Sequence, residues 1–378
     1  MPAAKSLSTR LTFLSIRFAS SSSSTSASQI ATSFLSRFQS LGPQTRTQYL
    51  DANQLRLLSL TLNRPSLYPH SQELSSTVAS SNNDDPETSI PPGTPLPAGY
   101  HLVYFTPAFL ESELGLDGTD TSYNPSHPFT RRMWAGGEVS WPRDEQGRVN
   151  PLRVGERVTE TTRVLSAEAK TVRKTGEEMI VVGVEKEFRN GGGVAVVDQR
   201  NWVFRKALPL TDSLSPSPSP SQSTTKSLPP TLPASSKTTS SENSLTHSRT
   251  LRQTAVTLFR FSALTFNPHK IHYSQPWARD VEGHKDIVVH GPLNLISILD
   301  LWRDIRVGAA GTGSSPGTEI DLAKVLPEKI EYRATSPLYA EDEYVIVLNQ
   351  EGENNKQSTV EILTPSKAVG MKATITGV

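Results

Sequence analysis

The sequence of 378 residues contains no cysteine, and this absence removes several kinds of site from consideration. Disulfide bonds, zinc–thiolate centres and thiol nucleophiles all need cysteine, whereas its absence says nothing about the compartment in which the protein works. No apolar run approaches the roughly 20 residues that a transmembrane helix requires. The formal net charge of +1 provides no basic field for nucleic acid. We therefore predict no membrane span, no nucleic-acid partner and no thiol chemistry.

Carboxylates are also missing from the start of the chain, where Asp51 is the first acidic residue. Serine is abundant in this region, arginine and lysine recur, and Leu7, Leu11 and Leu14 follow helical spacing. An amphipathic, acid-poor segment rich in arginine and serine is typical of a mitochondrial transit peptide, and a disordered tail is the alternative interpretation. We predict a transit peptide over residues 1–40 and a location in the mitochondrial matrix.

Aromatic residues are absent from residues 207–249, which consist largely of serine, threonine and proline. Such a stretch cannot bury enough apolar surface to offset the entropy that it would lose on ordering. We predict a disordered linker there. The linker divides the chain into a first folded block over residues 100–206, preceded by a helix and loop lead-in over 41–99, and a second folded block over 250–378.

Alternating apolar and polar residues predict antiparallel strands in the first block. Gly191–Gly193 predicts a hairpin turn, and it is not a phosphate loop because it lacks the GK[ST] ending and opens a strand. The lead-in predicts a helix over residues 45–62, but the block itself has no comparable helical run. For Trp134 we favour core packing over ligand contact, and for Arg131 and Arg132 a solvated face.

The second block holds four of the chain's eight histidines, between residues 269 and 290. Residues 253–264 predict a strand before them. After them, Gly291 and Pro292 suit the start of a helix, and the following LNLISILDLW is apolar almost all round, which indicates a buried helix. A helix N-terminus beside a histidine-rich loop can hold an anionic or carbonyl oxygen, so we predict the functional site there.

The sequence SALTFNPHKIH, followed by VVHGPL, resembles the MaoC-like hydratase/dehydratases of the hot-dog fold. It is most similar to the fungal mitochondrial 3-hydroxyacyl-thioester dehydratases (type 2) and to the mesaconyl-CoA hydratases. The family motif Ser-Gly-Asp-x-Asn-Pro-Leu-His falls on Thr265–His272. His272 therefore matches the catalytic histidine, whereas Asn267 stands where most members have the catalytic aspartate.

The resemblance covers residues 95–205 and 250–375 and implies an α+β double hot-dog. In that fold two antiparallel sheets are expected, with a long buried helix in the C-terminal half and a degenerate N-terminal half. Two such halves on one chain can act as a monomeric pseudo-dimer, and a homodimer is the alternative.

The chemistry that the resemblance implies is the dehydration of a 3-hydroxyacyl thioester, or the reverse hydration, without cofactor or metal. His272 is expected to move the α proton as general base, and Asn267 to hydrogen-bond the departing hydroxyl group. The N–H of Gly291, at the start of the buried helix, is expected to stabilise the enolate oxygen. His290 and Phe266 are expected to contact the substrate.

Each of these residues also has a structural interpretation. His272 is alternatively a packed histidine, Asn267 a turn former before proline, and His290 a residue that fixes the helix entry. A metal site formed with His269 and His284 is a further alternative, which we disfavour because no carboxylate or second helical histidine pair stands at a recognised ligand spacing.

Three functional hypotheses follow from these predictions. The first is a mitochondrial dehydratase acting on 3-hydroxyacyl groups carried by acyl carrier protein in fatty acid synthesis. The second is a hydratase of the mesaconyl-CoA type, which acts on coenzyme A thioesters of short dicarboxylic acids. The third is a hot-dog scaffold that binds acyl chains or a partner without turnover.

Overall fold

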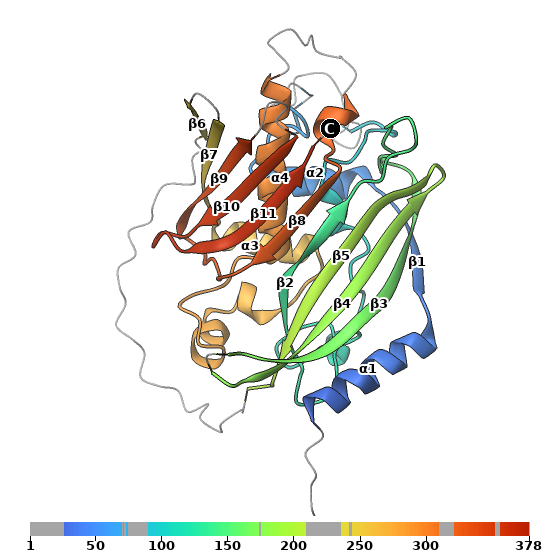
Figure 1. Cartoon of the computed structure of the whole chain (residues 1–378), viewed down its shortest axis with the longest axis vertical. Coiled ribbons are helices and arrows are strands. Elements are labelled where there is room, and N and C mark those ends of the chain that lie inside the picture. Colours follow the sequence, from blue (N-terminus) through green and yellow to red (C-terminus); the bar gives the residue numbers. More distant parts are fainter. Residues whose placement is uncertain are drawn as a thin grey trace, which may run out of the picture.

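The computed structural model describes residues 26–69, 71, 73–74, 90–173, 175–208, 236–241, 244–309, 321–351 and 356–377. Their strands form one antiparallel sheet of eleven strands in the order β1-β3-β4-β5-β2-β8-β11-β10-β9-β7-β6 (Figure 1). The strands are β1 (Gln44–Tyr49), β2 (Arg131–Ser140), β3 (Arg157–Thr171), β4 (Glu178–Asn190), β5 (Gly193–Arg205), β6 (Ser236–Ser241), β7 (Ser244–Arg252), β8 (Lys329–Ala334), β9 (Glu343–Glu351), β10 (Gln357–Leu363) and β11 (Val369–Thr376).

The sheet has two halves that meet where β2 pairs with β8. Strands β1 to β5 form the N-terminal half and β6 to β11 the C-terminal half (Figure 1). This arrangement confirms the predicted α+β double hot-dog, with the difference that the two expected sheets are continuous. The helices are α1 (Ala27–Leu41), α2 (Ala52–Thr61), α3 (Ala255–Leu264), α4 (Gly291–Ala309) and α5 (Leu322–Val325), with short turns η3 (Tyr100–Val103), η4 (Glu111–Glu113), η5 (Lys270–His272) and η6 (Trp277–Val281).

The junction of the two halves depends on a glycine pair in β2. A Cβ atom on Gly137 would lie 1.9 Å from the carbonyl oxygen of Gln199, and one on Gly136 would lie 2.5 Å from that of Tyr332. The register of β2 against β5 also shifts between Trp134 and Gly136. Only glycine allows β2 to approach strands on both sides this closely.

Helix α4 is the core of the C-terminal half, and its strands curve around it (Figure 1). Leu293, Leu295, Ile296, Ile298 and Leu299 are fully buried, which confirms the prediction of a buried helix. Their positions cover all sides of the helix, as expected for an element surrounded by protein. Among the described residues, no helix combines the length and apolarity needed to cross a membrane.

Helix α1 packs on the N-terminal half of the sheet, against β3 and β4 (Figure 1). Ser26 and Gln29 form a capping box at its start, in which each side chain bonds the backbone N–H of the other residue. Ile30, Phe34 and Phe38 recur every four residues and form one core with strand residues that include Ile180, Val182 and Phe204. The described residues of the first block, 100–206, contain only the short turns η3 and η4 besides strands, as expected for that block. The helix that covers their sheet comes instead from the segment predicted to be a transit peptide.

Two other segments differ from their predicted secondary structure. The predicted strand at residues 253–264 is helix α3, in which Leu258 and Phe261, three residues apart, are buried while Val256 and Phe259 are exposed. That spacing is helical, and Thr254 caps the helix by accepting from the N–H of Thr257. In the lead-in, the predicted helix over 45–62 is strand β1 followed by the shorter helix α2.

The linker predicted over residues 207–249 extends too far toward the C-terminus, because its last part forms strands. Strands β6 and β7 occupy residues 236–241 and 244–252 and extend the C-terminal half beyond β9. The polar residues Thr239 and Thr246 suit such an outer hairpin because one of its faces needs no core. Residues 209–235 of the predicted linker lie outside the described part of the chain.

Candidate active site

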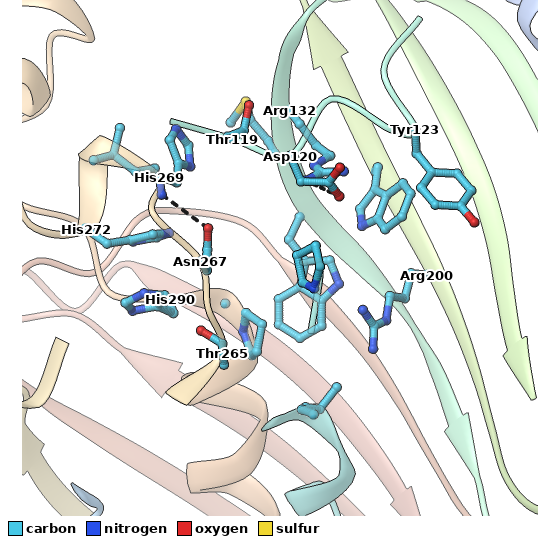
Figure 2. Close-up of a pocket in the computed structure, with 18 of the residues that line it drawn as sticks. Thr119, Asp120, Tyr123, Arg132, Arg200, Thr265, Asn267, His269, His272 and His290 are labelled. Carbon is cyan, nitrogen blue, oxygen red and sulfur yellow. Dashed lines mark hydrogen bonds and ion pairs between the residues drawn. The ribbon is translucent and has the colours of Figure 1, made fainter. Parts of the chain in front are cut away.

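A cavity of about 1870 Å³ lies between the two halves. Its wall combines α3, η5 and the start of α4 from the C-terminal half with α1 and strands β2 to β5 from the N-terminal half. All five residues predicted for the site line this cavity (Phe266, Asn267, His272, His290 and Gly291). Figure 2 shows His272, His290 and Asn267 on one side of it.

The imidazole of His272 is fixed by its backbone surroundings. It lies in η5, is buried, and its Nδ1 is 2.8 Å from the carbonyl oxygen of Val288. Because a carbonyl oxygen only accepts, Nδ1 carries the proton, and in the neutral ring the lone pair is on Nε2. Burial, with a smaller contribution from His269, lowers the pKa of His272 to about 3. The ring is therefore an unprotonated base at neutral pH.

His290 supports the His272 ring from one face. The two rings stack with centroids 3.6 Å apart and planes 18° apart. His290 Nε2 lies 2.9 Å from the hydroxyl oxygen of Ser262, and the rings of His290 and Phe261 form an edge-to-face contact. Burial also lowers the pKa of His290 well below its ordinary value, so two neutral rings can stack without charge repulsion. This geometry places His290 behind the base and at the entry to α4.

Asn267 lies on the turn that follows α3. Its Oδ1 accepts a hydrogen bond from the N–H of His269 at 3.3 Å, a local contact of the kind that forms turns before a helix (Figure 2). The amide NH₂ of Asn267 keeps donors that a leaving hydroxyl group can accept from. Phe266 beside it has a positive φ of 47° and is 56% exposed, so its ring borders the cavity at a solvent-accessible position.

The first residue of α4 touches the other half of the molecule. A Cβ atom on Gly291 would lie 2.1 Å from the indole ring of Trp134, so the ring packs directly on the start of the helix. Trp134 is thus both a packing residue, as predicted, and part of the cavity wall.

Arg131 and Arg132 are not on a solvated face, contrary to the prediction. Both guanidinium groups line the cavity and are largely buried; Arg131 lies 3.8 Å from a carboxylate oxygen of Glu282, and Arg132 lies 3.5 Å from one of Asp120. Arg132 also covers the ring of Trp202. Adjacent residues of a strand usually point to opposite faces, yet these two neighbours both line the cavity. The register of β2 is irregular near its glycines, and no pattern in the sequence indicated this irregularity.

A group of potential metal ligands lies beside His272. His269 Nε2 is 3.8 Å from an oxygen of Asp117 and 3.9 Å from one of Glu282, and the three ligand atoms all lie within 4.8 Å of one another. These residues have the chemistry of a divalent-cation site, although Arg131 already compensates part of the charge of Glu282. Among the described residues, the ligand atoms that lie close enough together to share an ion are those of Asp117, His269 and Glu282, and not those of the four histidines.

The depressed pKa values predict how stability depends on pH. Below pH 6.5 the unfolded chain protonates His272 and His290 while the folded protein does not, so unfolding becomes easier as the pH falls. Between pH 7.0 and 5.5 each histidine should cost about 1.3 kcal/mol of unfolding free energy. Urea unfolding at both pH values measures this loss. His272→Asn should remove about half of it, and an unchanged pH dependence would contradict the buried neutral state.

Comparison with known proteins gives concordant results. A family model described as hydroxyacyl-thioester dehydratase type 2 matches residues 99–340. The chain is 29% identical over 233 residues to a mesaconyl-C(4)-CoA hydratase of Chloroflexus aurantiacus, covering 61% of this chain and 72% of that protein. It is 25% identical over 263 residues to the mitochondrial hydroxyacyl-thioester dehydratase type 2 of Schizosaccharomyces pombe, covering 68% of this chain and 79% of the relative.

Among solved structures, the chain is similar to HtdX of Mycobacterium tuberculosis, with a TM-score of 0.48 and 11% identity. The match covers 89% of this chain and 100% of that one. A MaoC-like dehydratase from Phytophthora capsici gives a TM-score of 0.46 at 12% identity and covers 89% of this chain and 95% of that one.

Proposed function

Because the chain belongs to the hydroxyacyl-thioester dehydratase type 2 family, we propose that it is a hydro-lyase that interconverts 3-hydroxyacyl thioesters and 2-enoyl thioesters plus water. The observation that carries this proposal is the orientation of His272. Its Nδ1–H is held by the carbonyl of Val288, which leaves Nε2 as an unprotonated base at the wall of a large cavity.

In the dehydration direction, Nε2 of His272 takes the α proton of the thioester. The electron pair of the broken C–H bond forms the double bond between the α and β carbons, and the bond from the β carbon to the hydroxyl oxygen breaks. The proton held by His272 then passes to the departing hydroxyl, which leaves as water. The same histidine runs hydration in reverse, and no cofactor takes part.

Two other groups complete the proposed mechanism. The amide NH₂ of Asn267 donates to the hydroxyl oxygen and holds it near His272. Since Asn267 cannot accept a proton, His272 performs both proton transfers. The N–H of Gly291 at the start of α4 donates to the thioester carbonyl oxygen, where negative charge develops, and the helix dipole adds to this stabilisation. The stacked ring of His290 keeps the base in place.

We further propose a mitochondrial matrix location and an acyl carrier protein thioester as substrate. The Schizosaccharomyces pombe relative is named a mitochondrial enzyme, which supports the location. The acid-poor, arginine- and serine-rich start of the sequence is a second reason. Because α1 belongs to the core of the N-terminal half, the proposed presequence ends before Ser26 and not at residue 40.

A coenzyme A thioester of a short dicarboxylic acid is the second candidate substrate. It is favoured by the similarity to the Chloroflexus aurantiacus protein, which is named a mesaconyl-C(4)-CoA hydratase.

The test is to follow the absorbance of the enoyl thioester after adding (R)-3-hydroxyacyl groups on acyl carrier protein and on coenzyme A. We expect turnover, and the ratio of kcat/KM between the two carriers chooses between the substrates. A well-folded protein that turns over neither thioester would overturn the proposal in favour of a non-catalytic scaffold.

A further inference from the structure

Three side chains with metal-ligating atoms meet beside the turn that carries His272, and they come from distant parts of the chain. Asp117 lies in the loop between η4 and β2, His269 immediately precedes η5, and Glu282 follows η6. We name them the three-ligand site. Their side chains are 14%, 8% and 7% exposed, so protein encloses the site on most sides. Figure 2 shows His269 on the same side of the cavity as His272.

The imidazole of His269 has a buried nitrogen that lacks a partner in the described part of the chain. The whole residue is 6% exposed, and its Nε2 makes no hydrogen bond to any described residue. The facing oxygens of Asp117 and Glu282 are 3.8 and 3.9 Å away, which is too far for a hydrogen bond. Buried polar atoms without a partner are rare, and an ion or a water molecule commonly explains them. The space between the three atoms is therefore where a ligand is expected.

Each carboxylate is held so that one oxygen faces this imidazole. Asp117 Oδ1 accepts from the N–H of Thr119 at 3.0 Å and from its hydroxyl at 2.7 Å, which leaves Oδ2 toward the ring. Glu282 Oε1 faces the ring and accepts from Nε1 of Trp277 at 3.2 Å, while Arg131 lies 3.8 Å from the other oxygen. A carboxylate oxygen has a second lone pair for a further ligand. Supporting hydrogen bonds of this kind orient the ligands of metal sites.

The spacing of the three ligand atoms fits a metal ion. They lie within 4.8 Å of one another, with two separations of 3.8 and 3.9 Å, so an ion at the centre of their triangle would be about 2.5 Å or less from each. A water molecule needs about 2.8 Å and would have to leave that plane. One imidazole with two carboxylates suits Zn²⁺ or Mn²⁺. We propose that the three-ligand site binds one divalent cation of this kind, whose charge the two carboxylates balance.

A cation at this position joins the two halves of the molecule at the turn that carries His272. The loop of Asp117 already rests on this turn, because the N–H of Lys270 donates to the carbonyl oxygen of Asp117 at 2.8 Å. The approach is so close that a Cβ atom on Gly118 would lie 2.2 Å from the carbonyl oxygen of Pro268. The centroid of the imidazole ligand is 5.3 Å from that of His272, so the ion steadies the surroundings of the proposed base. The inference does not rest on the hydro-lyase reaction, which needs no cation.

The test titrates the full chain, freed of metal by a chelator, with ZnCl₂ and MnCl₂ in a calorimeter. We expect one tight site for at least one of the two ions, and a thermal unfolding midpoint that rises with the concentration of that ion. In ¹⁵N NMR spectra of histidine-labelled protein, Zn²⁺ should shift the ring nitrogens of His269 and leave those of the exposed His127 unchanged.

Asp117→Asn and Glu282→Gln are the informative variants. Each removes one negative charge but keeps the acceptor oxygen used by Thr119 or Trp277, so each should fold and weaken binding at least tenfold. His127→Gln removes a surface histidine and should bind the ion as the wild type does. Wild-type affinity no higher than that of either variant, or unchanged signals of His269, would mean an adventitious ion only and would refute the site. If both variants failed to fold, the signals of His269 in the wild type would decide alone.

Discussion

Replacing His272 by alanine should lower kcat/KM at least a hundredfold for either carrier, because the variant lacks the only group that we assign to proton transfer. A positioned general base contributes about 10²–10⁴-fold to a rate. The expected loss lies in the upper part of that range, since Asn267 cannot take over as a base. Stopped-flow or steady-state measurement of the enoyl absorbance gives the ratio directly.

His272→Asn separates basicity from architecture. An asparagine NH₂ can still donate to the carbonyl oxygen of Val288, as Nδ1–H does now, but it has no lone pair of comparable basicity. We expect the asparagine variant to be as inactive as the alanine variant, with a smaller loss of thermal stability. If His272→Asn kept more than about a tenth of the wild-type kcat/KM, His272 would be an orienting residue and not the base.

The site residues that could be predicted from the sequence are those that lie near one another in the sequence. Asn267 and His272 lie within one motif, which fixes their spacing before any fold is known, and Gly291 opens the apolar helical run that follows in the chain. The opposite wall could not be predicted in this way. Arg132 and Lys186 come from different strands, and their convergence on the cavity depends on how β2 to β5 curve.

Misassigned helices show a second limit of sequence patterns. Residues 253–264 mix β-branched and aromatic residues, which favour strands, yet the buried pair Leu258 and Phe261 has helical spacing and α3 forms. In α1 the error has a different origin. An amphipathic helix without acidic residues is the pattern of a presequence, and a helix that covers an apolar sheet face has the same pattern. Only the strand residues that pack against α1 distinguish the two, and they lie far away in the sequence.

Removal of α1 is the change with the largest expected effect on stability. It is tested by comparing a protein that begins at residue 26 with one that begins at residue 41. The shorter protein lacks α1 and exposes the face of β4 and β5 that carries Ile180, Val182 and Phe204. Ile30, Phe34 and Phe38 are all buried, and each large apolar side chain contributes roughly 1.5–3 kcal/mol on burial. The loss is about 5 kcal/mol or more, which is comparable with the whole stability of many domains.

Thermal unfolding and dye binding to exposed apolar surface measure this difference. The protein that starts at residue 26 should unfold like the full chain, whereas the one that starts at residue 41 should unfold at a much lower temperature, bind dye or aggregate.

Phe34→Ala and Leu41→Ala form a matched pair within the full chain, because Phe34 is buried and Leu41 is 60% exposed. Phe34→Ala should cost about 3–5 kcal/mol and Leu41→Ala little. Equal stability of the two truncated proteins would show that α1 is dispensable, and a mature N-terminus near residue 41 in mitochondria would then become compatible with the fold. Instability of the shorter protein would require any processing to stop before Ser26, because cleavage at residue 40 would remove the helix that covers this face of the sheet.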